Sequence, residues 1–455
     1  MTVSFNSREG MSVYRDLEKL NHTTFSQYVP DSAAIAVTKE MFIKEGFKIE
    51  AESEVGLSVS GSTPLINSFF NADVRRERLK FIRNTEYYGY ETTDELTSPL
   101  CQKEIEKITL PKQLFVLEPK KEQERPSLGY YHFQVPAGVK KAGKVEALHQ
   151  KGIQGRGIKA VMIDTGLYRH RYFKEQGYKF EVIPAVSSFD TSRDERGHGT
   201  GMASVLLAAA PAVDFKLVKA ADRYFSYPVA AFQKAVGVHP DIINCSWGVI
   251  GYEPQLYLEI ANAVYKEIIV VFSAGNGSSD RRNSLFQSVA YPDVISVGGC
   301  LPCEDGSVEI SDISSNYLSD IFPGRYAPDL CGICGKLPYA QVILMPIEPG
   351  SLFDVENGKR DGTGQDDGWF VSSGTSAAAA YVTGLTALLL QSGPVIKRAT
   401  IKNVLKECCA GIEKGKSFMG YPASAGVWNE AAGFGFLNGE GIRNYLEKVE
   451  LPGKS

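Results

Sequence analysis

The sequence has little net charge, few histidines and no apolar run of membrane-spanning length. Its 455 residues carry a formal net charge of -4 and include six histidines, and the basic residues form no cluster. This balance gives no reason to expect nucleic acid or an anionic membrane as a partner. The apolar stretch from Ala377 to Leu390 is shorter than the ~20 residues that cross a bilayer, which favours a buried core helix.

The N-terminal residues also lack the basic segment and the following apolar segment of a secretory signal. We therefore expect a cytoplasmic protein, in which thiols stay reduced. The eight cysteines are then expected to be packing residues or metal ligands before they are disulfides.

The composition is that of a globular enzyme with a substantial core, since 43% of the residues are hydrophobic and 22% are charged. The length predicts two or three domains, or one large domain with an appendage. Residues 1–135 are more charged and less regular, which indicates a small α+β domain with a strand near 47–60 and a helix near 64–70. A charged, proline-containing linker, 118–126, follows, and residues 136–455 form the second predicted domain.

From Val139 onward, strand-like apolar segments alternate with helix-like segments. Strands and helices are predicted along the chain in this order: strand 158–163, helix 199–210, strand 215–218, helix 229–236, strand 242–246, helix 256–267 and strand 268–273. Apolar strands joined by helices are typical of a parallel sheet that is buried on both faces, so we predict a doubly wound α/β fold. Functional residues in such sheets gather beyond the carboxyl ends of the strands.

Four polar residues lie in glycine-containing turns at such positions: Asp164, His198, Asn276 and Ser376. Ser376 opens the apolar helix, where the positive end of the helix dipole and free backbone donors stabilise a developing negative charge. Each residue also has an ordinary alternative, because all four residue types cap helices or form turns. Their joint occurrence favours an acid, a base, an amide donor and a nucleophile of one catalytic site.

Four motifs carry a resemblance to subtilisin-type serine proteases, which extends over about residues 138–410. They are Asp164-Thr-Gly166, Gly197-His-Gly-Thr200, Ser273-Ala-Gly-Asn276 and Gly374-Thr-Ser-Ala-Ala378. Their order along the chain, Asp then His then Ser, is the subtilisin order. The resemblance implies that Ser376 attacks the peptide carbonyl, that His198 moves the proton and that Asp164 orients the imidazole. Asn276 and the backbone N–H of Ser376 would then hold the oxyanion.

The same resemblance implies a set of peptide-binding residues. The segment 244–248, with the sequence Asn-Cys-Ser-Trp-Gly, matches the strand that pairs with the substrate backbone. Ser246, Trp247 and Gly248 are therefore expected to bind substrate. The segment 221–224 is a looser match to the opposite wall of the cleft.

The N-terminal domain resembles, more faintly, the α+β propeptides of these proteases. The resemblance rests on residues 56–61 and 66–71. It implies a domain that assists folding and blocks the cleft through its C-terminal strand, with self-cleavage near residues 126–131. A permanently attached recognition domain is the alternative.

Two features depart from the family pattern. Ala380 stands four residues after the nucleophile, where the family usually has proline. It is either a tolerated substitution or a source of room for an amine acceptor, which would allow transpeptidation. The acidic segment 352–369 could bind Ca²⁺ or a basic substrate, but its spacing differs from that of an EF-hand, and a solvated acidic loop is the alternative.

Two Cys-x-x-Cys pairs precede the predicted nucleophile, namely Cys300 with Cys303 and Cys331 with Cys334. This is the usual spacing of a tetrahedral structural Zn²⁺ site. Buried thiols and a redox disulfide are the alternatives, and the resemblance implies no metal or other cofactor for catalysis itself.

The sequence thus predicts a serine endopeptidase that acts on peptide or protein substrates through an acyl-enzyme. Two alternatives stay open. One is a pseudo-protease that binds peptides without cutting them, and the other is a transpeptidase of peptide maturation.

Overall fold

A computed structural model describes residues 1–79, 87–98, 103–115, 133–249, 251, 253–277, 290–336, 343–358, 361–372, 374–393, 400–424 and 426–450. The predicted linker, 118–126, lies outside these ranges. Within them, no helix has both the length and the apolar character that a bilayer crossing requires.

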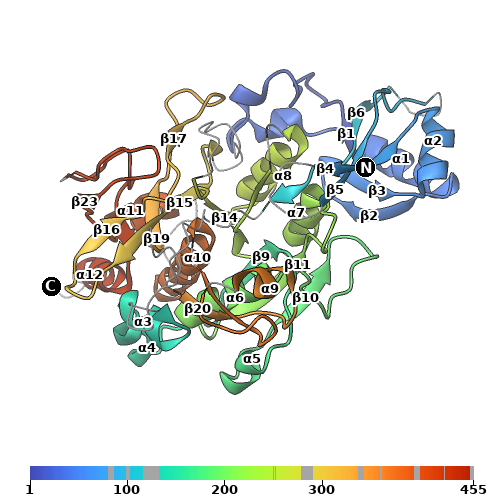
Figure 1. Cartoon of the computed structure of the whole chain (residues 1–455). Helices are drawn as coiled ribbons and strands as arrows, with labels where there is room; N and C mark the ends of the chain where they lie inside the picture. Colours follow the sequence, from blue (N-terminus) through green and yellow to red (C-terminus); the bar gives the residue numbers. More distant parts are fainter. Residues whose placement is uncertain are drawn as a thin grey trace.

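A sheet of mostly parallel strands forms the centre of the molecule (Figure 1). Its main strand order is β10-β11-β9-β12-β14-β15-β19-β24-β22, and every neighbouring pair from β10 to β24 is parallel. The strands are β9 (Lys159–Asp164), β10 (Glu181–Pro184), β11 (Asp214–Lys219), β12 (Ile242–Cys245), β14 (Ile269–Ser273), β15 (Ile295–Pro302), β19 (Leu330–Ile333), β22 (Cys409–Ala410) and β24 (Phe436–Leu437), with β16 (Val308–Ile310) and β23 (Lys414–Gly415) as a side branch. The predicted α/β fold with a mostly parallel sheet is confirmed.

Helices pack on this sheet in layers. α10 (Thr375–Ser392) packs on β12, β14, β15 and β19 and lies beside α6 (His198–Ala209). α7 (Pro228–Gly237) and α8 (Pro254–Tyr265) pack on each other. α10 is buried from its first residue to Leu389, because alanines and larger apolar residues leave it no polar face. It is therefore the core helix that the sequence predicts.

Short helices and small sheets surround this core. The helices are α3 (Ala137–Ala142), α4 (Glu146–Gln150), α5 (Arg171–Glu175), α9 (Leu352–Asn357), α11 (Ile401–Glu407) and α12 (Gly439–Glu450). The strands form three small sheets: β8 (Phe133–Gln134) with β20 (Ile343–Pro346) and β21 (Trp369–Ser372), β17 (Tyr317–Leu318) with β18 (Tyr326–Ala327), and β7 (Leu114–Phe115) with β13 (Gly248–Val249). The last of these joins the N-terminal residues to the segment expected to bind substrate.

The N-terminal residues form a second, antiparallel sheet with the order β2-β3-β1-β6. Its elements are β1 (Thr2–Phe5), η1 (Leu17–Lys19), η2 (Phe25–Tyr28), α1 (Ser32–Lys44), β2 (Lys48–Glu52), β3 (Gly56–Ser60), α2 (Thr63–Phe70) and β6 (Ile105–Thr109), and a hairpin of β4 (Arg75–Leu79) and β5 (Tyr87–Glu91) projects from it. Where the sequence predicts one strand over 47–60, the structure has the hairpin of β2 and β3. Val3, Phe42, Phe47 and Leu57 belong to an apolar core of its own.

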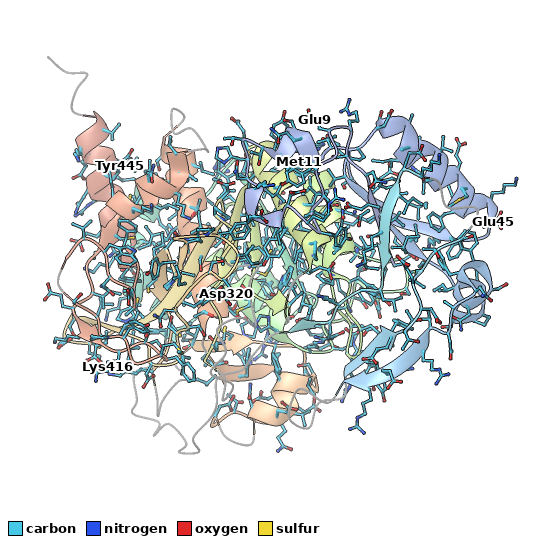
Figure 2. All side chains as sticks on the ribbon, turned by 90° about the horizontal axis from the view of Figure 1, so that it is seen from above. Glu9, Met11, Glu45, Asp320, Lys416 and Tyr445 are labelled. Carbon is cyan, nitrogen blue, oxygen red and sulfur yellow. The ribbon has the colours of Figure 1, made fainter. Side chains whose placement is uncertain are left out.

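One segment of this domain packs on the main core instead. Phe25 and Tyr28 belong to the same buried cluster as the central sheet, and the ring centroids of Phe25 and Tyr265 at the end of α8 lie 5.0 Å apart. Figure 2 shows Met11 toward the middle of the molecule, whereas Glu45 lies at the outer end of the domain. The N-terminal domain is thus held to the rest of the chain by more than its strand β7.

Candidate active site

Two neighbouring parallel strands bring the first residues of the site together. Asp164 ends β9, and Ser246 follows the last residue of β12. Ile163 and Cys245 are partners in the register of these strands. The indole N–H of Trp247 donates to the carbonyl of Ile163 at 2.7 Å, which fixes the two strand ends to each other. The site therefore lies at the carboxyl edge of the sheet, as predicted.

His198 lies over this edge as the first residue of α6, with its ring directed at Asp164. Its Nδ1 is 2.7 Å from Asp164 Oδ1, which also accepts from the backbone N–H of Thr165 at 2.8 Å. Both side chains are buried. Because an ionised carboxylate only accepts hydrogen bonds, Nδ1 carries the proton and Nε2 is the ring nitrogen with the lone pair.

A buried aspartate that the sequence reasoning missed shapes the turn before His198. Asp194 accepts hydrogen bonds from the hydroxyl of Thr165, the backbone N–H of Gly197, and both the N–H and the hydroxyl of Thr200. Burial raises the pKa of Asp194 to about 6. A polar residue four positions before the histidine was the available signal.

The turn also requires glycine on both sides of His198. Gly197 has φ +90°, in the left-handed region. A Cβ on Gly199 would lie 2.1 Å from the carbonyl oxygen of Gly166, so only glycine lets α6 approach the end of β9 this closely. The two glycines therefore set the position of His198 relative to Asp164.

Ser376 is held in the first turn of α10 by reciprocal hydrogen bonds with Ser246. The hydroxyl of Ser376 donates to the carbonyl of Ser246 at 2.9 Å, and the hydroxyl of Ser246 donates to the carbonyl of Ser376 at 2.9 Å. Asn244 supports this pair, since its amide donates to the Ser246 hydroxyl at 3.0 Å. Ser376 thus lies at the same sheet edge as Asp164, one strand away.

Helices α6 and α10, whose first turns contain His198 and Ser376, pack closely on each other. A Cβ on Gly384 of α10 would lie 2.9 Å from the carbonyl oxygen of Leu206 and 2.6 Å from Cβ of Ala209 in α6. Gly384 follows Ser376 by the same number of residues as Leu206 follows His198. His198 and Ser376 thus both lie in the first turn of a helix of this packed pair, and both helices begin at the carboxyl edge of the sheet.

Asn276 contacts the residues just before the serine. Its Oδ1 accepts from the backbone N–H of Thr375 at 2.8 Å and from the Thr375 hydroxyl at 3.0 Å. A Cβ on Gly374 would lie 2.6 Å from Asn276 Nδ2, so glycine makes room for the amide. The amide oxygen of Asn276 is thus engaged by Thr375, and its Nδ2 lies beside Gly374 at the start of α10.

The expected substrate strand is paired with the N-terminal domain. Gly248 and Val249 of β13 are antiparallel partners of Phe115 and Leu114 of β7. Trp247 contributes its main chain only, because its ring is 2% exposed and packs on Phe272 in the core. Its indole therefore does not line a specificity pocket.

Comparisons with known proteins agree with this architecture. The model of the subtilase family of peptidases matches residues 155–435. The chain belongs to the subtilase family. Subtilisin NAT of Bacillus subtilis subsp. natto is 25% identical over 291 residues, which are 61% of this chain and 66% of that protein. The Major intracellular serine protease of Bacillus subtilis (strain 168) is 30% identical over 184 residues, which are 36% of this chain and 57% of that protein.

The fold of this subtilase is also similar to a solved structure. The crystal structure of fervidolysin from Fervidobacterium pennivorans, described as a keratinolytic enzyme related to subtilisin, matches with a TM-score of 0.58 at 18% identity. The match covers 97% of this chain and 60% of that one. The subtilase chain thus spans less than two thirds of these relatives.

The two Cys-x-x-Cys pairs do not form the predicted zinc site in this subtilase. Cys300 lies in β15 and Cys331 in β19, and Cys303 and Cys334 come directly after the last residues of these strands. Residues three apart along an extended chain point to opposite faces, roughly 10 Å apart. In a zinc knuckle, a turn between the two cysteines of a pair brings both sulfurs to one metal ion. In the described ranges, no three His, Cys, Asp or Glu side chains lie where they could hold a metal ion. Cys300, Cys303, Cys331 and Cys334 form no disulfide bond in the structure.

The acidic segment of the subtilase is more ordered than a solvated loop. It begins with α9, whose Phe353 ring lies 6.0 Å from the ring of His198. Asp354 is buried and accepts from the N–H of Gly350 at 2.8 Å, and burial raises its pKa to about 6. Asp361 accepts from the N–H of Val371 at 2.8 Å. These carboxylates therefore hold the segment together beside His198.

Proposed function

We propose that this subtilase is a serine endopeptidase that cleaves peptide bonds with Asp164, His198 and Ser376. The observation that carries the proposal is the 2.7 Å contact of Asp164 with His198 Nδ1, at the same sheet edge as Ser376. To react, the Ser376 hydroxyl leaves the carbonyl of Ser246 and turns toward Nε2 of His198. The imidazole takes its proton as the oxygen attacks the carbonyl, and Asp164 stabilises the imidazolium that forms.

The negative charge of the tetrahedral intermediate falls on the carbonyl oxygen. Asn276 supplies a side-chain N–H at the start of α10, and the backbone N–H of Ser376 supplies a second donor. The positive end of the long α10 dipole adds to this stabilisation. His198 then returns its proton to the leaving amine, and water hydrolyses the acyl-enzyme by the same steps.

We propose that the N-terminal domain blocks the cleft until its strand β7 is displaced. Strand β7 occupies the edge of β13, which is where an extended peptide substrate would pair. β7 runs antiparallel to β13, so its last residue, Phe115, lies opposite Gly248, two residues after Ser246, whose carbonyl accepts from the Ser376 hydroxyl. Self-cleavage is therefore proposed soon after Phe115, ahead of the region 126–131 that the sequence indicated; both stretches lie outside the described residues.

Labelling and mass spectrometry test these proposals together. Wild-type protein should react with a fluorophosphonate at Ser376, while Ser376→Ala should not. The wild-type chain should be cut into two fragments at a site soon after Phe115, so that its intact mass is lost, whereas Ser376→Ala stays intact. Protein that neither labels nor cleaves peptides after removal of the N-terminal domain would support the peptide-binding pseudo-protease instead.

Transpeptidation has no support from the surroundings of Ala380. Ala380 is fully buried within α10, so its small side chain opens no solvent-filled space for an amine acceptor. Incubation of the acyl-enzyme with a peptide amine should give hydrolysis, and a ligated product would reverse this conclusion.

The cytoplasmic location remains a prediction. One relative is named an intracellular protease. Cell fractionation with detection of the chain in the cytoplasmic fraction would test it.

A further inference from the structure

Leu114 in strand β7 has both polar groups of its main chain held by side chains. Its N–H donates to the hydroxyl of Ser226 at 2.5 Å, and its carbonyl accepts from Nη1 of Arg196 at 3.4 Å. Leu114 is also the antiparallel partner of Val249 in β13. The peptide is therefore bound by one strand and by two side chains.

Both side chains are fixed by the same turn. Arg196 is fully buried, and its Nε donates to the carbonyl of Asp222 at 2.7 Å. Ser226 forms a bridge with Ala221, which closes the turn that contains Asp222. Since Arg196 also lies two residues before His198, it connects the wall of the cleft to the segment that carries the catalytic base.

We propose that Arg196 and Ser226 form a main-chain anchor for substrates, at the position that Leu114 occupies. The inference rests on the proposed endopeptidase activity. Neither bond involves the leucine side chain, so any peptide in the same register offers the same N–H and carbonyl. Gly248 pairs with the residue after this position, and Ser246 lies two residues before Gly248. The anchor therefore binds the substrate residue that comes three positions before the one opposite Ser246.

The anchor has two consequences for specificity. Substrates that do not extend to this position lose two hydrogen bonds, one of them to a charged guanidinium. Proline at this position has no N–H for Ser226, so it should be disfavoured whatever its apolar character.

A series of three substrates separates the two side chains. The first is a peptide with three residues and a free amine on the acyl side of the cleaved bond. The second is the same peptide with an acetyl group, which restores the carbonyl that faces Arg196 but not the N–H that faces Ser226. The third has a fourth, acetylated residue and restores both, and its fourth residue is either alanine or proline.

In the wild type, each step should raise kcat/KM, together on the order of 10-fold or more. Arg196→Met should abolish most of the first step, and Ser226→Ala should abolish most of the second and the preference for alanine over proline. Each step is the ratio of kcat/KM for two substrates measured on one protein preparation. A smaller fraction of folded protein lowers both values equally and leaves the ratio unchanged. Arg223→Met, which removes an exposed charge from the same turn, is the matched control and should show the wild-type steps. Equal steps in wild type, Arg196→Met and Ser226→Ala would overturn the anchor.

A second measurement does not depend on catalysis. In the full chain with Ser376→Ala, amide hydrogen exchange at Leu114 should speed up about 10-fold or more when Ser226→Ala is added, and not with Arg223→Met. Protein that cleaves no peptide would refute the endopeptidase, while accelerated exchange would still support the anchor. Unchanged exchange in the Ser226→Ala protein would refute the anchor itself.

Discussion

Glu259 of α8 lies in the interface with the N-terminal domain and should make stability depend on pH. It is fully buried, and its Oε1 accepts from the hydroxyl of Ser53 at 2.7 Å and from the amide of Gln233 at 2.9 Å. Its Oε2 is buried without a hydrogen-bond partner in the described part of the chain. Burial raises its pKa from 4.5 to about 7. The folded protein therefore holds a proton on Glu259 that the unfolded chain releases.

The sign and size follow from this difference. Below pH 4.5, Glu259 is protonated in both states and burial carries no electrostatic cost. Between pH 4.5 and 7, Glu259 ionises in the unfolded chain but keeps its proton in the folded protein, so ionisation favours the unfolded state. The free energy of unfolding therefore falls by about 3 kcal/mol as the pH rises through this range, because each pKa unit corresponds to about 1.36 kcal/mol. Glu259→Gln keeps the shape without the ionisable group.

Urea unfolding at a series of pH values measures the effect, with Ser376→Ala as the background to prevent self-digestion. The free energy of unfolding of Glu259→Gln relative to its parent should rise by about 3 kcal/mol between pH 4.5 and pH 8. Glu175→Gln, which changes an exposed residue of α5, is the matched control and should follow the parent. A constant difference between the Glu259→Gln protein and its parent would show that the folded protein does not hold this proton.

Three further predictions concern the catalytic site and the cysteines. Asn276→Ala should lower kcat on the order of 10²–10³-fold with a smaller change in KM, because the amide donor acts mainly on the transition state. Steady-state kinetics on a peptide substrate would measure both constants, and equal losses in binding and turnover would contradict that role. Asp194→Ala removes an acceptor of four hydrogen bonds and should lower the free energy of unfolding by at least ~3 kcal/mol, measured by urea titration against Asp190→Ala, an exposed residue of the same loop. Purified protein should contain no stoichiometric zinc by metal analysis, and a chelator should leave Tm unchanged, since Cys300 and Cys331 lie in extended strands; a chelator-induced fall in Tm would restore the zinc site.

Local patterns were sufficient for part of the central sheet and for the long helix that packs on it. The apolar segment 158–163 became β9, and the alanine-rich run after Ser376 became the buried helix α10, because hydrophobic periodicity acts over neighbouring residues. The same reasoning misjudged the residues 47–60, where a polar turn divides one apparent strand into the hairpin of β2 and β3. Alternation within each half looked continuous because the turn is short.

Spacing alone misled where the backbone conformation decides the outcome. Two cysteines three residues apart meet at one metal only in a turn, and both pairs here fall in or beside extended strands. Trp247 lies next to residues that are expected to bind substrate, but strand alternation turns its ring into the core against Phe272.

The sequence by itself determined the parallel α/β fold and the residue types of the candidate site, because both depend on short-range patterns and on motifs that match a family. Only the tertiary structure decided that Asp194 shapes the histidine turn, that β7 pairs with β13, and that Arg196 and Ser226 hold the main chain of β7. Some of these contacts join residues that are far apart along the chain, and others depend on main-chain groups. Neither kind of contact can be recognised in a single sequence.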